Sequence, residues 1–270
     1  MRFCANVSIL SKEAPFLERF RRVAEAGFSA VEFLWPLGED LGEVEAAIKE
    51  ADLAVALFNF YAGDMPAGDR GLLSDPGRQE GFRENVPAAL ELAQRLGCSK
   101  LNALVGQEVV GMSREVQLDL ARENVGWAAD RAGEYGIEVL VEAVNTFENG
   151  KYLLYRTDDA AEFVASVGKA NVKLQHDLYH MQRMEGNLEV TLRRHIGEIR
   201  HVQVADSPGR GEPGTGEIHY PYIFGALEEL GYDGYIGLEY NPTTERTEDS
   251  FAWIPEGLRG GDVRVEDLEL

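Results

Sequence analysis

Short apolar segments alternate with longer amphipathic segments along most of the chain. The short segments are rich in branched residues, and we expect strands at residues 2–8, 30–34, 53–59, 99–104, 137–143, 171–176, 199–204 and 235–239. The longer segments have helical spacing, and we expect helices at 15–26, 42–51, 78–96, 115–135, 158–167, 187–196 and 221–230. The alternation predicts a series of βα units.

Glycine follows several of these helices at the point where a C-cap favours a positive φ, as at Gly27, Gly97, Gly136, Gly168 and Gly231. Eight strands separated by seven helices favour a closed parallel (β/α)8 barrel. A doubly wound open sheet has the same local pattern and is the alternative.

The length of 270 residues is close to the roughly 250 of a (β/α)8 barrel, and no low-complexity linker divides the chain. We therefore expect one domain spanning 1–270. From about residue 243 the chain is charged but contains Trp253 and Ile254, and we expect a last helix and a tail over the barrel. The longest loops, 61–77 and 205–220, follow predicted strands, on the face where barrel enzymes carry their sites.

Composition narrows the class of protein. A formal net charge of -21 disfavours binding to nucleic acid or to a membrane surface, and an anionic substrate would need a metal or an arginine to hold it. Cys4 and Cys98 are too few for a disulfide framework, so we expect reduced, buried thiols. The N-terminal residues lack the pattern of a secretory signal, which predicts a cytoplasmic protein.

Four oxygen-bearing side chains lie at the ends of the last four predicted strands: Glu142, Asp177, Gln203 and Glu239. A barrel gathers the carboxyl ends of its strands around one rim, so these residues can converge on one point. Three carboxylates packed together repel one another unless a cation lies between them. The set predicts a hard divalent ion, Mg²⁺ or Mn²⁺, rather than zinc, because no His or Cys joins it.

The chain resembles the hydroxypyruvate isomerases, a family within the xylose-isomerase-like TIM barrels. The resemblance is carried by FCANVSIL (3–10), GFSAVEFLWP (27–36), FNFYAGDMPAGDRG (58–71), DLYHMQRMEGNL (177–188), HVQVADSPGRGEPGTGEIHY (201–220) and GYIGLEYNP (234–242). It implies a metal-assisted aldose–ketose isomerase that interconverts hydroxypyruvate and 2-hydroxy-3-oxopropanoate (tartronate semialdehyde) through an enediolate.

The resemblance also implies roles for the strand-end residues. Glu142 and Glu239 match the catalytic acid/base pair and two of the metal ligands, and Asp177 and Gln203 match the other two. Gln203 stands where many sugar epimerases of the superfamily carry a histidine, and this departure argues against a generic ketose epimerase.

Other residues near these strand ends are candidates for contact with substrate. In similar enzymes the histidine at the position of His180 bonds a substrate oxygen, Arg210 could clamp the substrate carboxylate, and Glu148 lies shortly after Glu142. His176 should point away and pack. Weaker candidates are Asn145, Asn59, Glu32 and a lid residue, Arg70, with Trp35, Phe60 and Tyr61 as side chains that exclude water.

Three other functions stay open. A 2-oxotetronate isomerase of the same family would use the same metal and glutamates but would need space and a partner for one more carbon and hydroxyl. An endonuclease of the superfamily would be expected to have several metal-binding histidines and a basic groove. A non-catalytic barrel that binds a metabolite is the third. The sequence leaves the oligomeric state open, including a homo-oligomer.

Overall fold

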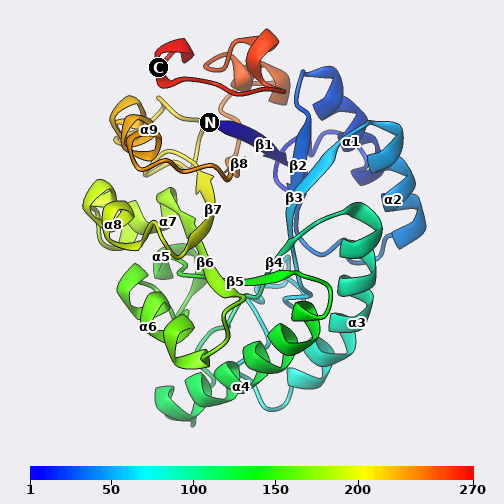
Figure 1. Ribbon diagram of the computed structural model, residues 1–270, viewed down its shortest axis with the longest axis vertical. Coiled ribbons are helices and arrows are strands. Elements are labelled where there is room, and N and C mark those ends of the chain that lie inside the picture. The colour runs from blue at the N-terminus through cyan, green and yellow to red at the C-terminus, as the bar shows by residue number, and fades with distance from the viewer.

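Eight parallel strands close into a barrel in chain order in the computed structural model, which describes residues 1–270 (Figure 1). The strands are β1 (Arg2–Asn6), β2 (Ala30–Phe33), β3 (Ala54–Asn59), β4 (Lys100–Asn102), β5 (Glu138–Glu142), β6 (Val172–Asp177), β7 (Ile199–Val204) and β8 (Tyr235–Leu238). β1 pairs with β8 and completes the circle. The closed barrel confirms the predicted fold and excludes the open sheet.

All seven predicted helices are present, with ends within two residues of the expected ones. They are α1 (Phe16–Glu25), α2 (Leu41–Glu50), α3 (Gln79–Leu96), α4 (Arg114–Gly133), α6 (Thr157–Val167), α8 (Leu188–His195) and α9 (Tyr220–Glu229). They surround the strands on the outside of the barrel (Figure 1). The five glycines expected after helices all have positive φ. None of the helices has both the length and the apolar composition needed to cross a membrane.

Side-chain hydrogen bonds cap the start of two of these helices, α2 and α4. The Asp40 carboxylate accepts hydrogen bonds from the backbone N–H groups of Gly42 and Glu43 at 2.8 and 3.0 Å, and it caps α2. Ser113 caps α4 in the same way. The strands are buried on both faces, because one face fills the barrel and the other packs on the helices. Cys4 and Cys98 are free and buried, as predicted.

Two short helices that the pattern does not predict follow the strands that carry the site. α5 (Thr146–Asn149) follows β5, and α7 (Leu178–Met184) begins directly after β6. The side chain of Asn145 caps α5 and that of Asp177 caps α7. Helices of four and seven residues are too short to show a helical period in the sequence.

The expectation of a last α-helix after residue 243 is wrong. The segment forms three short 3₁₀ turns, η1 (Thr247–Phe251), η2 (Glu256–Leu258) and η3 (Val265–Asp267). Pro255 and the glycines that follow it interrupt any longer helix. The segment lies between α9 and α1, where an eighth outer helix would lie (Figure 1). It is held there by Phe251 against Phe28, with ring centroids 4.9 Å apart, and by Trp253 stacked on Phe224.

Candidate active site

The four strand-end residues lie together at the carboxyl end of the barrel. Glu142 ends β5, Asp177 ends β6, Gln203 lies one residue before the end of β7, and Glu239 directly follows β8. All four are at least nine-tenths buried. Ligand atoms of Glu142, Asp177 and His180 lie within 4.8 Å of one another. Gln203 and Glu239 are joined to this group through shared partners: Gln175 Nε2 contacts both Glu142 and Gln203, and Arg210 Nη2 lies 3.9 Å from Asp177 and 2.8 Å from Glu239.

Neutral amides hold one oxygen of each glutamate. Glu142 Oε2 accepts hydrogen bonds from Asn102 Nδ2 at 2.9 Å and from Gln175 Nε2 at 3.0 Å. Glu239 Oε1 accepts one from Asn6 Nδ2 at 3.0 Å. Each of the three amides comes from the end of a neighbouring strand. The second oxygen of Glu142 has no donor from the protein, whereas that of Glu239 accepts a hydrogen bond from Arg210.

The two carboxylate oxygens of Asp177 also have different surroundings. Its Oδ1 accepts the backbone N–H groups of Tyr179 and His180, at 2.8 and 3.2 Å, and so caps α7. Its Oδ2 is buried and has no hydrogen-bond partner. The nearest cationic or donor groups are His180 Nε2 at 3.6 Å and Arg210 Nη2 at 3.9 Å. An ionised oxygen in this position requires a positive charge beside it.

Arg210 reaches into the site from the loop 205–220. Its Nη2 donates to Glu239 Oε2 at 2.8 Å, and its backbone has a positive φ of 56°. The loop is built around Asp206, whose carboxylate accepts backbone N–H groups of Ser207, Gly214, Gly216 and Ile218. Arg210 is therefore placed to compensate the carboxylates of the site, and its role as a substrate clamp stays a prediction.

The crowding of carboxylates changes their acidity. Burial, together with repulsion from Glu239 and Asp177, raises the pKa of Glu142 well above its usual range. Burial also raises the pKa of Glu239, to about 8, although the charge of Arg210 opposes this. Both glutamates can hold a proton near neutral pH, which is the requirement for groups that exchange protons with a substrate.

His180 presents a defined N–H to the cavity. Asn145 Oδ1 accepts the backbone N–H of Glu148 at 3.1 Å, so Asn145 Nδ2 faces His180 Nδ1, 2.7 Å away. Nδ1 is therefore the acceptor and Nε2 carries the proton. Burial lowers the pKa of His180 to about 4, which keeps the ring neutral. Nε2–H lies 3.9 Å from Glu142 Oε1.

The other accessory residues are placed less uniformly. Glu148 is exposed on the rim, accepts a hydrogen bond from the Tyr179 hydroxyl, and does not line the cavity. Arg70 lines the cavity, and its Nε donates to Asn149 Oδ1 at 2.6 Å. His176 is buried and lines no part of the cavity, as predicted.

The site opens into a cavity of about 370 Å³. Beyond the predicted residues, its lining includes Lys12, Ser8, Asn149 and Tyr152. Lys12 and Arg70 add to Arg210, so three cationic side chains line a cavity in an acidic protein. This charge suits an anionic ligand.

A neighbouring cavity of about 440 Å³ shares part of this lining. Trp35, Phe60 and Tyr61 line this second cavity and not the first. They follow the ends of β2 and β3 and line the neighbouring cavity, so their expected role in excluding water from the metal pocket stays a prediction. Asn59 lines both cavities.

The amides Asn6, Asn102 and Gln175 were not predicted to belong to the site. The available signal was an amide residue at or near the carboxyl end of a strand, as in RFCAN, KLN and VKLQHD. Such a residue has to find a buried partner, and here the partner is a carboxylate of the site.

Comparison with known proteins places this arrangement in a family. The model of the xylose isomerase-like TIM barrel family matches residues 20–257. The hydroxypyruvate isomerase of Escherichia coli (strain K12) is 42% identical over 94% of this chain and 98% of its own length. The 2-oxo-tetronate isomerase of Cupriavidus necator is 40% identical over 94% and 97%.

Among solved structures, a protein named AP endonuclease, family 2, from Brucella melitensis superposes with a TM-score of 0.89. It is 43% identical, and the match covers 93% of this chain and 97% of that one. The two curated relatives are isomerases, and the solved structure has the same fold as this chain. The chain therefore belongs to the hydroxypyruvate isomerase family of the xylose isomerase-like TIM barrels.

Proposed function

We propose that the protein is a divalent-metal-dependent isomerase that interconverts hydroxypyruvate and 2-hydroxy-3-oxopropanoate. The observation that carries the proposal is the pair of buried glutamates, Glu142 and Glu239, which line one cavity and have raised pKa values. Aldose–ketose isomerisation of a small acid needs groups of this kind at two neighbouring carbons.

The side chains fit a divalent ion held by Glu142, Asp177, Gln203 and Glu239. The buried Asp177 Oδ2 without a partner supports this set, as does its purely oxygen chemistry. In Glu142 and Asp177 only one oxygen is bound to protein donors, so each would offer its other oxygen, and Glu239 would offer Oε2, which Arg210 also contacts. Single-oxygen ligation suits Mg²⁺ or Mn²⁺ better than Ca²⁺, which often takes both oxygens. When bound, the ion would supply positive charge that stabilises the negative charge developing on the substrate oxygens.

Proton transfer is the work of the glutamates. One carboxylate removes a proton from C3 of hydroxypyruvate, and the electron pair of that C–H bond forms the C2–C3 double bond of an enediolate. The other glutamate, protonated, returns a proton to C2 as the C3 oxygen becomes the carbonyl. The hydroxyl proton of C3 passes to the oxygen on C2, so the step conserves all atoms. In the absence of the ion, burial and the crowding of the carboxylates raise the pKa of both glutamates, which favours a proton on one of the pair.

His180 and the cations of the cavity orient the acid. The Nε2–H of His180 can donate to a substrate oxygen, because Asn145 fixes the tautomer. Arg210, Lys12 and Arg70 surround the cavity with positive charge that can hold the substrate carboxylate. This local charge offsets the repulsion that a protein of net charge -21 exerts on an anion.

A four-carbon acid is the second candidate substrate. The cavity of about 370 Å³ exceeds what a three-carbon acid fills, and it adds polar residues such as Ser8 and Asn149 that could bond one more hydroxyl. A relative with 40% identity is named 2-oxo-tetronate isomerase. The glutamates and the metal would act in the same way on this substrate.

A turnover assay on both acids tests the proposal. Enzyme stripped of metal by chelation and then supplied with Mg²⁺ or Mn²⁺ should convert hydroxypyruvate, and the stripped enzyme should be inactive. The ratio of kcat/KM for hydroxypyruvate and 2-oxotetronate identifies the substrate. Binding of both acids without turnover of either, with metal present, would show a metabolite-binding barrel. Full activity after complete removal of metal would overturn the metal dependence.

A further inference from the structure

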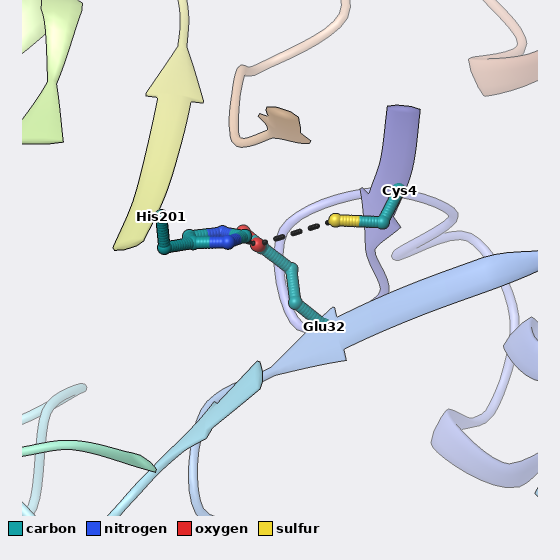
Figure 2. A group of neighbouring side chains, drawn as sticks. All are labelled: Cys4, Glu32 and His201. Atoms are coloured by element: carbon teal, nitrogen blue, oxygen red, sulfur yellow. Dashed lines mark hydrogen bonds and ion pairs between the residues drawn. The ribbon is translucent and has the colours of Figure 1, made fainter. Parts of the chain in front are cut away.

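Glu32 is a fully buried carboxylate inside the barrel, below the candidate site. It lies on β2, and four side chains donate hydrogen bonds to it. Figure 2 shows Cys4, Glu32 and His201 pointing toward one another from three different strands, β1, β2 and β7. Glu32 takes no part in the chemistry described above.

Two of the four donors connect Glu32 to the candidate metal ligands. Glu32 Oε1 accepts hydrogen bonds from Gln203 Nε2 at 2.6 Å and from Asn6 Nδ2 at 3.0 Å. Asn6 Nδ2 also donates to Glu239 Oε1, at 3.0 Å. One oxygen of Glu32 thus touches one candidate ligand directly and reaches a second through a single amide.

The bond to Glu32 decides which way the Gln203 amide points. Because Nε2 is turned down toward Glu32, Oε1 is turned up toward the site, where it accepts a hydrogen bond from Gln175 Nε2 at 2.6 Å. An amide in the opposite orientation would present N–H to a cation and could not bind it. Asn6 is fixed as well, because its Oδ1 accepts the backbone N–H of Ser8 at 3.1 Å.

The other oxygen of Glu32 faces Cys4 and His201. His201 Nε2 is hydrogen-bonded directly to Oε2, so these atoms face each other and not a common ion. Cys4 Sγ donates to the same oxygen at 3.5 Å. On the β8 side the carboxylate fits only because residue 237 is glycine, since a Cβ there would overlap it. The surroundings hold the carboxylate in one place.

We propose that Glu32 is a positioning residue for the metal site. It sets the orientation of the Gln203 amide and, through Asn6, the position of the Glu239 carboxylate. The inference rests on the proposed function, because it assumes that these two side chains bind the ion.

Two substitutions separate the position of the acceptor from its charge. Glu32→Asp keeps the charge but withdraws the oxygen from Gln203 by one methylene. Glu32→Gln keeps the length. Its amide N–H can turn toward His201, whose Nδ1 has no partner and can take up the ring proton, so that Nε2 becomes the acceptor. Its oxygen then still serves Gln203 and Asn6.

The test measures the Kd for Mn²⁺ by isothermal titration calorimetry, with the thermal midpoint as a check on folding. Glu32→Asp should weaken Mn²⁺ binding by about 10- to 100-fold, the usual effect of disturbing an outer-shell partner, and Glu32→Gln should stay within about threefold of wild type. Cys4→Ala removes a donor to the other oxygen and is the matched control, with an unchanged Kd. If Glu32→Asp does not fold, Gly237→Ala takes its place, because the new Cβ displaces the same carboxylate.

Two results would overturn the positioning role. An unchanged Kd in a folded Glu32→Asp variant would mean that the contact to Gln203 does not matter for metal binding. A loss in Glu32→Gln as large as that in Glu32→Asp would mean that an acceptor oxygen at the native position does not preserve the site, so the position of this oxygen is not what acts. Failure of the proposed function looks different: wild-type protein would bind no Mn²⁺ at all if the metal site is absent, or would bind Mn²⁺ with an unaltered Glu32 dependence but turn over neither acid if the isomerase activity is absent.

Discussion

The charges of the two catalytic candidates are compensated by different groups. Glu142 is held by two neutral amides, from Asn102 and Gln175, whereas Glu239 has one amide and the guanidinium of Arg210. A nearby cation favours an ionised carboxylate, and burial among neutral groups favours a protonated one. We therefore expect the proton shared by the pair to reside mainly on Glu142 before metal and substrate bind.

Substitution of either glutamate by glutamine tests proton transfer. Glu142→Gln and Glu239→Gln should each lower kcat by about 10²- to 10⁴-fold, because an amide can touch a metal but cannot carry the proton. Calorimetry with Mn²⁺ separates this effect from loss of the ion. Wild-type enzyme in deuterated water should place deuterium on the carbon that receives the proton. Undiminished turnover by either metal-loaded variant would rule out the assigned role.

Arg210→Met should act on both binding and acidity. Loss of the guanidinium removes the only charge-assisted bond to Glu239, so the pKa of this carboxyl should rise further and the basic form should require a higher pH. We expect a KM for the acid raised about 10-fold or more, with the acidic limb of the kcat/KM profile moved to higher pH. Arg246→Met, which removes an exposed arginine, is the control. An unaltered KM and profile would contradict both roles of Arg210.

At the level of single residues, the sequence reveals the strand-end carboxylates but not the amides that hold them. Glu142, Asp177 and Glu239 stand out because a charged residue ends an apolar segment. The register of the barrel strands determines which carboxylate is bonded by Asn6, Asn102 and Gln175. It sets Glu142 opposite Gln175 on the neighbouring strand, for example. Neither the strand register nor the orientation of a side-chain amide can be predicted from the local sequence.

The loop between β3 and α3 carries Arg70 into the cavity and depends on Gly71. Gly71 has a φ of 114° and forms an antiparallel bridge with Val105 after β4. A Cβ at this position would overlap the backbone carbonyl of Leu104. The loop therefore sits on the barrel rim only if this residue has no side chain.

Gly71→Ala should detach this loop from the rim. We expect a higher KM for the acid, faster proteolysis within residues 61–77, and a loss of stability of about 1–3 kcal/mol. Gly68→Ala is a matched control, since Gly68 also has a positive φ but a Cβ there meets nothing within 4 Å. It shares the backbone strain without the collision. Equal effects of the two substitutions would show that docking on Leu104 is unimportant.

At the level of elements, the hydrophobic period along the sequence predicts the long, regular helices. The seven outer helices extend over at least two turns and were found in sequence, whereas α5 and α7 depend on single caps at Asn145 and Asp177. The C-terminal segment fills the place of an eighth helix with large side chains and not with a helix. Apolar residues such as Trp253 indicate that such a segment is buried, but they do not predict its backbone conformation.

The stability of the whole molecule should depend on pH through the buried glutamates. A carboxyl with a folded pKa of about 8 stabilises the fold fully below its unfolded value, near 4.5, and this contribution is lost as the pH rises through 8. Burial lowers the pKa of His180 to about 4, so its effect lies below its ordinary value of 6.5 and does not interfere. Metal-free protein should therefore melt at a lower temperature at about pH 8.5 than at about pH 6.5.

Thermal melting across this range measures the effect. Saturating Mn²⁺ should remove most of the decline, because the ion binds the ionised carboxylates of the folded state. Glu239→Gln should flatten the profile of the metal-free protein, since an amide does not titrate. A flat profile for metal-free wild type would show that the glutamates are not held at raised pKa values.

The residues between the two cavities of the rim belong to a different part of the chain from the carboxylates that would carry out the reaction. Met65 and Pro66 line both cavities and belong to the loop 61–77, whereas the carboxylates belong to the barrel wall. Replacement of Met65 by a smaller residue would join the two cavities and lengthen the space beside the reacting carbons. The strands that carry the carboxylates would be unchanged. Relatives with one catalytic centre could thus diverge in the size of the acid they accept by changes in a surface loop alone, and protein engineers could follow the same route.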